Sequence, residues 1–212
     1  MNRAELKANA KEQIKGKIGI LFVISLVIGV ISVAASMILA FIPFVGSLAS
    51  AIIVTPAFAL STMRIYLNVT YGATPEVKDA FSGFDDFWTA FKVNFLVGLY
   101  TFLWSLLFVI PGIVKSLSYS MAMYVLAENK GMTASECIDK SKAITDGYKG
   151  ELFVLGLSFI GWAFLGGITF GIAFIWIMPY MQTTYANAYR YLNPVASNRV
   201  NPGTEDAIAS EM

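Results

Sequence analysis

The feature that most constrains this chain is an uncharged run of 46 residues, from Ile18 to Met63, flanked by Lys17 and Arg64. One crossing of a bilayer takes about 20 apolar residues, because a helix rises about 1.5 Å per residue and the hydrocarbon core is about 30 Å thick. The run is too long for one crossing and long enough for two. It therefore predicts a helical hairpin in a membrane.

Composition favours a membrane protein along the whole chain. Of the 212 residues, 57% are hydrophobic and 14% are charged, whereas about 25% of the residues in soluble domains are charged. The chain has one cysteine and no histidine, so it lacks the commonest metal ligand and the usual general base near neutral pH. We predict an all-α, polytopic membrane protein, and we expect no cofactor.

The plan of two apolar helices joined by a turn recurs twice more. The three predicted hairpins cover residues 18–67, 92–127 and 152–192, and their expected turns lie at residues 43–46, 111–112 and 166–167. The first and third hairpins share a detail, because Pro56 precedes Tyr66 by ten residues and Pro179 precedes Tyr189 by ten. The chain is thus predicted to form six transmembrane helices arranged as three hairpins.

A cytoplasmic amphipathic helix is predicted before each hairpin. These segments cover residues 2–17, 75–91 and 133–148. Asn2 can cap the first segment, and Thr133 with Glu136 forms a capping box for the third. The second segment is expected to start at residues 74–75 and to break at residues 82–83, where Ser-Gly follows a helical pattern.

The first segment has a thin apolar face, on which Leu6, Ala10 and Ile14 recur every four residues. Its cations are Arg3, Lys7, Lys11, Lys15 and Lys17. One interpretation is a solvated lead-in to the first span. The other is a helix that lies on an anionic leaflet, where each Lys or Arg adds about 1 kcal/mol of binding free energy.

The second segment carries an aromatic face. Its members recur at helical spacing and are Phe81, Phe84, Phe87, Trp88 and Phe91. Aromatic side chains at a membrane boundary are typical of interfacial helices, so this face is a candidate for contact with the membrane interface or a partner. Packing against the protein's own bundle is an open alternative.

The charges predict the orientation of the chain. With six spans, fourteen of the fifteen Lys and Arg residues and all fourteen acidic residues fall on the side of the two termini, and Lys115 is the exception. Cytoplasmic loops carry the excess of Lys and Arg, so both termini are predicted in the cytoplasm and the protein in the cell membrane. Residues 1–192 are expected to form a single membrane domain, followed by a disordered cytoplasmic tail over 193–212.

The sequence contains no metal-binding cluster, histidine-based triad or phosphate-binding loop. Asp85 and Asp86 form a carboxylate pair, but adjacent helical residues do not face each other. We interpret these two as charges at a helix start. The chain is therefore not expected to be an enzyme.

Polar side chains in three predicted spans form the best candidate for an intramembrane site. They are Asn94, Lys115, Ser116, Ser118, Tyr119, Ser120, Gln182, Thr183, Thr184 and Asn187. Together they could line a cavity for a lipid head group or an uncharged solute. The alternative is that they hydrogen-bond one helix to another. Lys115 is expected near the outer interface, where its ammonium can reach water.

Four segments resemble a known bacterial family. They are Arg3-Ala4-Glu5-Leu6-Lys7, Pro111-Gly112-Ile113 with residues 117–129, Ser141-Lys142 with residues 147–150, and residues 157–162. On these motifs the chain is identified as a member of the domain-of-unknown-function 975 (YciC-like) family of integral membrane proteins. The resemblance implies six spans and no assigned activity, and it transfers no catalytic residue to this chain.

Three classes of function remain after these observations. The preferred hypothesis is a non-enzymatic membrane module that binds lipid or a partner protein through its cytoplasmic amphipathic helices. The second is a transporter for a lipid or an uncharged small solute, and the third is a membrane enzyme. Membrane lipid is the expected partner, with a cytoplasmic or membrane protein as a further one, no nucleic acid, and the oligomeric state open.

Overall fold

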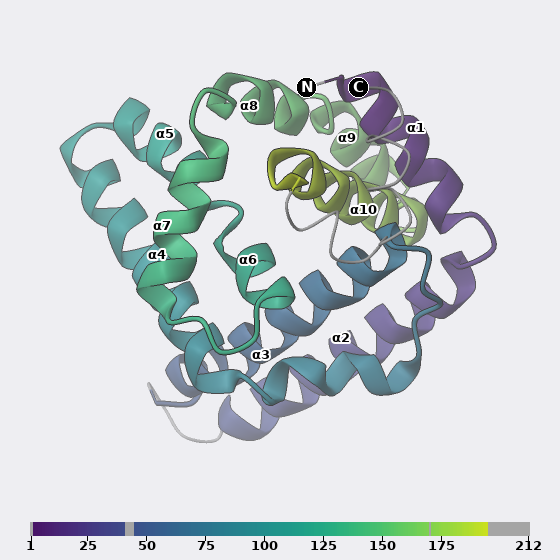
Figure 1. Cartoon of the computed structure of the whole chain (residues 1–212). Coiled ribbons are helices and arrows are strands. Elements are labelled where there is room, and N and C mark those ends of the chain that lie inside the picture. Colours follow the sequence, from purple (N-terminus) through teal and green to yellow (C-terminus); the bar gives the residue numbers. More distant parts are fainter. Residues whose placement is uncertain (1, 41–44, 170, 195–212) are drawn as a thin grey trace.

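The computed structural model describes residues 2–40, 45–169 and 171–194, with the backbone alone described at 38–40, 45–53 and 107. Across these residues every regular element is a helix (Figure 1), as predicted. The first three are α1 (Arg3–Ile14), α2 (Ile18–Ala40) and α3 (Val45–Thr70). Asn2 caps α1, because its side-chain oxygen accepts from the Ala4 and Glu5 backbone N–H groups at 3.2 and 3.4 Å.

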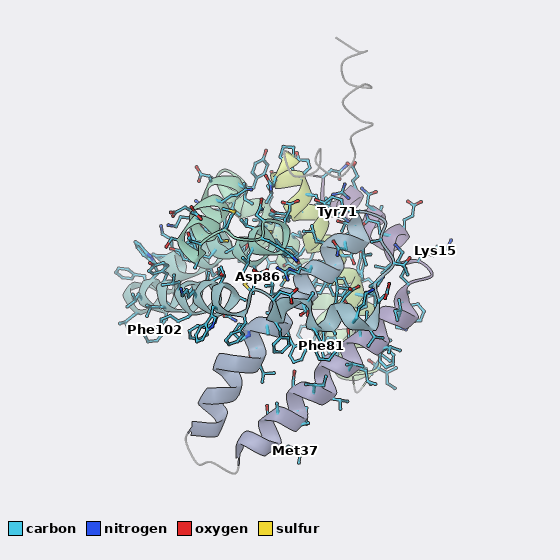
Figure 2. All side chains as sticks on the ribbon, turned by 60° about the horizontal axis from the view of Figure 1, so that its bottom comes forward. Lys15, Met37, Tyr71, Phe81, Asp86 and Phe102 are labelled. Carbon is cyan, nitrogen blue, oxygen red and sulfur yellow. The ribbon has the colours of Figure 1, made fainter. Side chains whose placement is uncertain are left out.

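The α2–α3 pair packs side by side, and its hairpin projects from the rest of the chain in Figure 2, where Met37 marks the projecting part. The predicted turn at residues 43–46 lies largely outside the described residues, since 41–44 are not described. Pro56 lies inside α3, as predicted.

The second amphipathic segment differs from its prediction. It forms a short 3-10 helix, η1 (Val77–Phe84), capped by Glu76 and Asp79 rather than by residues 74–75. The break predicted at residues 82–83 falls instead at Asp85 and Asp86, before α4 (Phe87–Leu107). Gly83 allows η1 to approach α3 closely. Its N–H donates to Ser61 Oγ at 2.8 Å, and a Cβ at this position would clash with the α3 backbone.

The turn of the second hairpin also lies elsewhere. It occurs at Phe108, which is extended, and not at residues 111–112. Pro111 lies in the first turn of α5 (Val109–Tyr119), where a missing N–H costs no intrahelical bond. The predicted fourth helix is interrupted after α5, and α6 (Ala122–Glu128) follows.

The third amphipathic segment forms α7 (Ala134–Thr145), and its capping box is confirmed. The Thr133 N–H donates to the Glu136 carboxylate at 2.7 Å, and the Glu136 N–H donates to Thr133 Oγ1 at 3.4 Å. On its buried face, Ser141 donates to the Ser118 carbonyl at 2.8 Å. This bond satisfies a carbonyl at the interruption between α5 and α6.

The last three helices are α8 (Lys149–Leu157), α9 (Ile160–Ile168) and α10 (Phe174–Leu192). The turn predicted at residues 166–167 is wrong, because Gly166 is buried within α9 against the Phe174 ring. The turn follows Thr169, whose Oγ1 accepts from the Ala173 N–H at 3.1 Å.

Within the part of the chain that the structure describes, four helical stretches are long and apolar enough to cross a membrane. They are Ile18–Met37, Phe87–Leu106, Val109–Glu128 and Lys149–Ile168. The core is centred on the second half of α3 and on α10, which pack against each other (Figure 1). It also includes inward-facing side chains of the candidate spans, such as Leu21, Val93 and Val125. Leu60, Val69 and Tyr189 are fully buried there. Further helices, α1, α2 and α6, pack around this pair.

Candidate functional site

The residues of the predicted polar cluster lie in two places. Lys115, Ser116, Ser118, Tyr119 and Ser120 belong to α5 and its end, which packs chiefly against α4, α7 and α8. Gln182, Thr183, Thr184 and Asn187 belong to α10, which packs chiefly against α1, α2, α3 and α9. Asn94 is half-buried on α4. The structure therefore does not gather these ten side chains around one site.

Four hydroxyl groups of the cluster bond along their own helices. Ser116, Ser118 and Ser120 donate to carbonyls three or four residues earlier at 2.8 to 3.0 Å. Thr184 donates in the same way to the Tyr180 carbonyl at 2.7 Å. Thr183 Oγ1 is buried and has no hydrogen-bond partner among the residues that the structure describes. The four bonded hydroxyl groups are thus engaged within their own helices and are not arranged around a common ligand position.

Lys115 lies against an aromatic ring at the α4–α5 hairpin. Its Nζ is 4.7 Å from the centroid of the Trp104 ring, and its side chain is half-buried. A cation over an indole face is favourable, and tryptophan is enriched at membrane interfaces. This geometry suits an interfacial lysine, and its position in a membrane stays a prediction.

Asn187 belongs to a network that the sequence did not reveal. Its amide donates to Gln13 Oε1 at 2.8 Å, and the Gln13 amide donates to the Thr70 carbonyl at 3.4 Å. Arg190 also donates to the Thr70 carbonyl, and its guanidinium lies 4.4 Å from the centroid of the Tyr71 ring. The network joins α1 and α10 to the end of α3.

A second network converges on Glu128, at the end of α6. Its carboxylate accepts from the Tyr71 hydroxyl at 2.8 Å, the Tyr189 hydroxyl at 2.6 Å and the Asn193 amide at 3.2 Å. Burial, and then the bond to Glu128, raise the pKa of Tyr71 well above its ordinary value. Asn193 is buried, although the prediction assigned it to a disordered tail. The rest of that tail, from residue 195, lies outside the described residues.

Tyr189 is part of the proline–tyrosine spacing that the first and third predicted hairpins share. No local pattern indicated Glu128, because its three partners are 57 to 65 residues away in the chain. Helical periodicity relates only residues a few positions apart, so it cannot predict this network.

A buried ion pair fixes the start of α4. The Arg64 guanidinium donates to the Asp86 carboxylate and to the Ser82 carbonyl. The Arg64 side chain is 8% exposed and the Asp86 side chain 22%. Asp86 is the N-cap residue of α4, as predicted for a charge at a helix start, but its side chain makes no capping bond to that helix. It instead holds η1 and α4 against α3, near the centre of Figure 2.

Nearly the whole chain matches the model of one protein family. A family model described as "Protein of unknown function (DUF975)" matches residues 1–118 and 106–195. The chain belongs to this family. Neither a curated protein nor a solved structure matches the chain. Membership confirms the resemblance found in the sequence.

In this DUF975 protein, the aromatic face of the second segment is largely open. Phe81, Phe84 and Trp88 are exposed, and Phe84 meets one core side chain, Phe58 of α3, edge to face at 5.4 Å. We call the side chains Phe81, Phe84, Phe87, Trp88 and Phe91 the aromatic strip. Their rings form two groups, Phe81 with Phe84 on η1, and Phe87, Trp88 and Phe91 on α4. The strip leads along α4 to the exposed Phe95 and Phe102 (Figure 2).

The remaining candidate spans also expose apolar side chains. The exposed positions include Leu26, Val30, Val33 and Met37 on α2, Ile110 and Ile113 on α5, and Phe164 and Ile168 on α9. Soluble monomers rarely expose large contiguous apolar surfaces. The outward faces of these helices are therefore suited to contact with lipid.

Proposed function

We propose that this DUF975 protein is a non-enzymatic membrane module that binds lipid or a partner protein through α1, η1 and α7. The observation that carries the proposal is the junction at η1. There an exposed charged pair, Lys78 and Glu76 at 2.8 Å, adjoins the exposed aromatic strip. A charged surface that meets an aromatic one is typical of the membrane interface.

The proposed topology is three hairpins with six spans in the cell membrane, and both termini in the cytoplasm. The one-sided distribution of Lys and Arg supports this orientation. Among residues 2–40, 45–169 and 171–194, four stretches qualify as candidate spans by length and composition. The less apolar α10 is compatible with the proposal, since its polar side chains are covered by neighbouring helices and need not face lipid.

Cysteine labelling in intact cells tests the topology. The background is Cys137→Ala, because the native thiol is buried and burial raises its pKa to about 11, which keeps it protonated and slow to react. A cysteine at Lys130 should react with an impermeant maleimide only after the cells are opened. A matched cysteine at Ile110, exposed at the α4–α5 turn, should react from outside. Labelling of position 130 in intact cells would reverse the proposed orientation.

Lipid retention tests the proposed activity. The full chain, purified in mild detergent, should carry phospholipid adducts in native mass spectra, and vesicles containing it should show the same flux of uncharged solutes as empty vesicles. Absence of lipid adducts, or solute flux above that of empty vesicles, would contradict a lipid-binding module. The second result would point to the transporter hypothesis instead.

A further inference from the structure

A cavity of about 330 Å³ lies where α1 and the start of α2 meet α9 and α10. Its apolar lining comes from Ile14, Ile18, Trp162, Trp176, Ile177 and Tyr180. The exposed side chains of Lys11 and Lys15 complete the lining. The cavity thus combines an apolar interior with two cations from one helix.

The packing of α1 explains why these lysines lie there. Leu6, Ala10 and Ile14 are buried, and α1 packs along α10. Residues four apart share a face of a helix, so Lys7 and Lys11 form a second row beside the buried one. Lys15, the C-cap residue of α1, follows them, and we call these three the lysine row. Lys7 Nζ donates to Ser158 Oγ at 2.7 Å, and Lys11 Nζ lies 5.7 Å from the centroid of the Tyr180 ring.

The lysine row is locally rich in positive charge. Among the described residues, Lys11 and Lys15 have no carboxylate within ion-pair distance. Burial lowers the pKa of Lys7, and the charges of Arg3 and Lys11 lower it further. The smaller contribution, from Arg3 and Lys11, is repulsion among cations, which an added anion would relieve.

We propose that this cavity binds an anionic phospholipid, with an acyl chain between Trp162 and Trp176 and the phosphate at Lys11 and Lys15. The proposal rests on the proposed function, and it names the lipid class and the place of binding. A small soluble anion would leave the apolar walls uncovered. A lipid without net charge would leave the two lysines without a counter-charge.

The size of the cavity favours a lipid chain over a protein segment. A volume of about 330 Å³ falls at the lower end of the usual range for small-ligand sites. A docked helix is about 10 Å wide with its side chains and requires a longer open groove. The Trp176 side chain, which is 62% exposed, places an indole at the mouth of the cavity. Tryptophan is enriched at the level of lipid head groups, so this position suits a lipid site.

Tryptophan fluorescence can locate the lipid directly. The full chain carries four tryptophans, and Trp88→Phe with Trp104→Phe leaves Trp162 and Trp176 as probes at the cavity. In mixed micelles, brominated phosphatidylglycerol should quench these two at a lower mole fraction than brominated phosphatidylcholine. The expected preference is about fivefold for each lysine, which corresponds to about 1 kcal/mol.

Charge variants distinguish lipid binding in this cavity from general electrostatic attraction of anionic lipid to the protein surface. Lys11→Gln with Lys15→Gln should abolish the preference, whereas Lys92→Gln with Lys130→Gln removes the same total charge elsewhere and should preserve it. All four lysines are exposed, so the thermal midpoints should stay equal, which confirms that each variant is folded.

The outcomes distinguish the two proposals. Equal quenching by both lipids, or a preference that survives in the Lys11 and Lys15 variant, would overturn the site even if lipid adducts persist in mass spectra. The proposed function would then stand without this cavity. A chain that retains no lipid at all would overturn both.

Discussion

The helices α4 and α10 are similar in length and have opposite surroundings. Only 11% of the candidate span in α4 is buried, and side chains such as Phe102 and Leu106 point away from the protein. In α10, Thr183, Thr184 and Asn187 are buried. Of these two helices, the more apolar α4 carries the surface suited to lipid, whereas the less apolar α10 lies in the core.

The physical reason is the nature of the solvent. Lipid tails are as apolar as leucine, so burial of apolar side chains gives little driving force between helices in a bilayer. Close packing and hydrogen bonds then carry more of the association energy. The networks at Glu128 and at Thr70 both involve the ends of α3 and α10, where the core is formed.

The largest effect is expected from breaking the buried ion pair beside the core. Arg64→Ala should lower the free energy of unfolding by about 4 kcal/mol, because Asp86 loses its partner at a mostly buried position. Unfolding by SDS in mixed micelles measures the change. The double variant Arg64→Met with Asp86→Leu should recover much of it, and a loss equal to that of Arg64→Ala would contradict the pairing argument.

A matched pair of leucines tests the contrast between core and lipid face. Leu60→Ala on α3 should cost about 3 kcal/mol, since Leu60 is fully buried and the variant leaves a cavity. Leu106→Ala on α4 should change stability by less than about 0.5 kcal/mol, since its side chain is 74% exposed. The same titration measures both. Equal losses would show that the α4 surface is covered by something other than lipid.

The Glu128 network should give an intermediate effect. Glu128→Gln weakens the acceptor shared by Tyr71, Tyr189 and Asn193, and it should cost about 2 kcal/mol. Glu76→Gln is the control, because its ion pair with Lys78 is solvent-exposed and should contribute little. A loss in the control as large as that in Glu128→Gln would show that the network does not join the core helices.

The smallest effect is expected at Lys115. Lys115→Gln removes the contact with Trp104 and should cost about 0.5 kcal/mol. The Trp104 emission maximum provides an independent measurement, and it should shift in this variant. An unchanged emission maximum would mean that the Lys115 ammonium does not contact the Trp104 ring in solution.

The helix ends show where sequence reasoning succeeded and where it failed. The caps at Asn2 and Thr133 were predicted correctly, because each depends on residues two or three positions away. The turns near residues 111 and 166 were misplaced by a few positions. Glycine or proline there was interpreted as a chain break, whereas Gly166 makes room for the Phe174 ring and Pro111 starts a helix.

The aromatic strip and the polar cluster show the same limit. Helical spacing placed five aromatic residues on one face, and the structure divides their rings into two groups, Phe81 with Phe84 on η1 and Phe87 with Trp88 and Phe91 on α4. Spacing could not decide whether Ser118 and Asn187 share a site. That depends on which helices pack together, and α5 and α10 have different principal neighbours.

The sequence alone determined that this chain is helical and rich in helices long and apolar enough to span a membrane, because segment length, hydropathy and capping are local properties. The tertiary structure decided which helices form the core and which polar groups meet. Tyr71, Glu128 and Tyr189 are brought together from distant parts of the chain. Packing of α3 against α6 and α10 joins them, and no periodic pattern in the sequence specifies that contact.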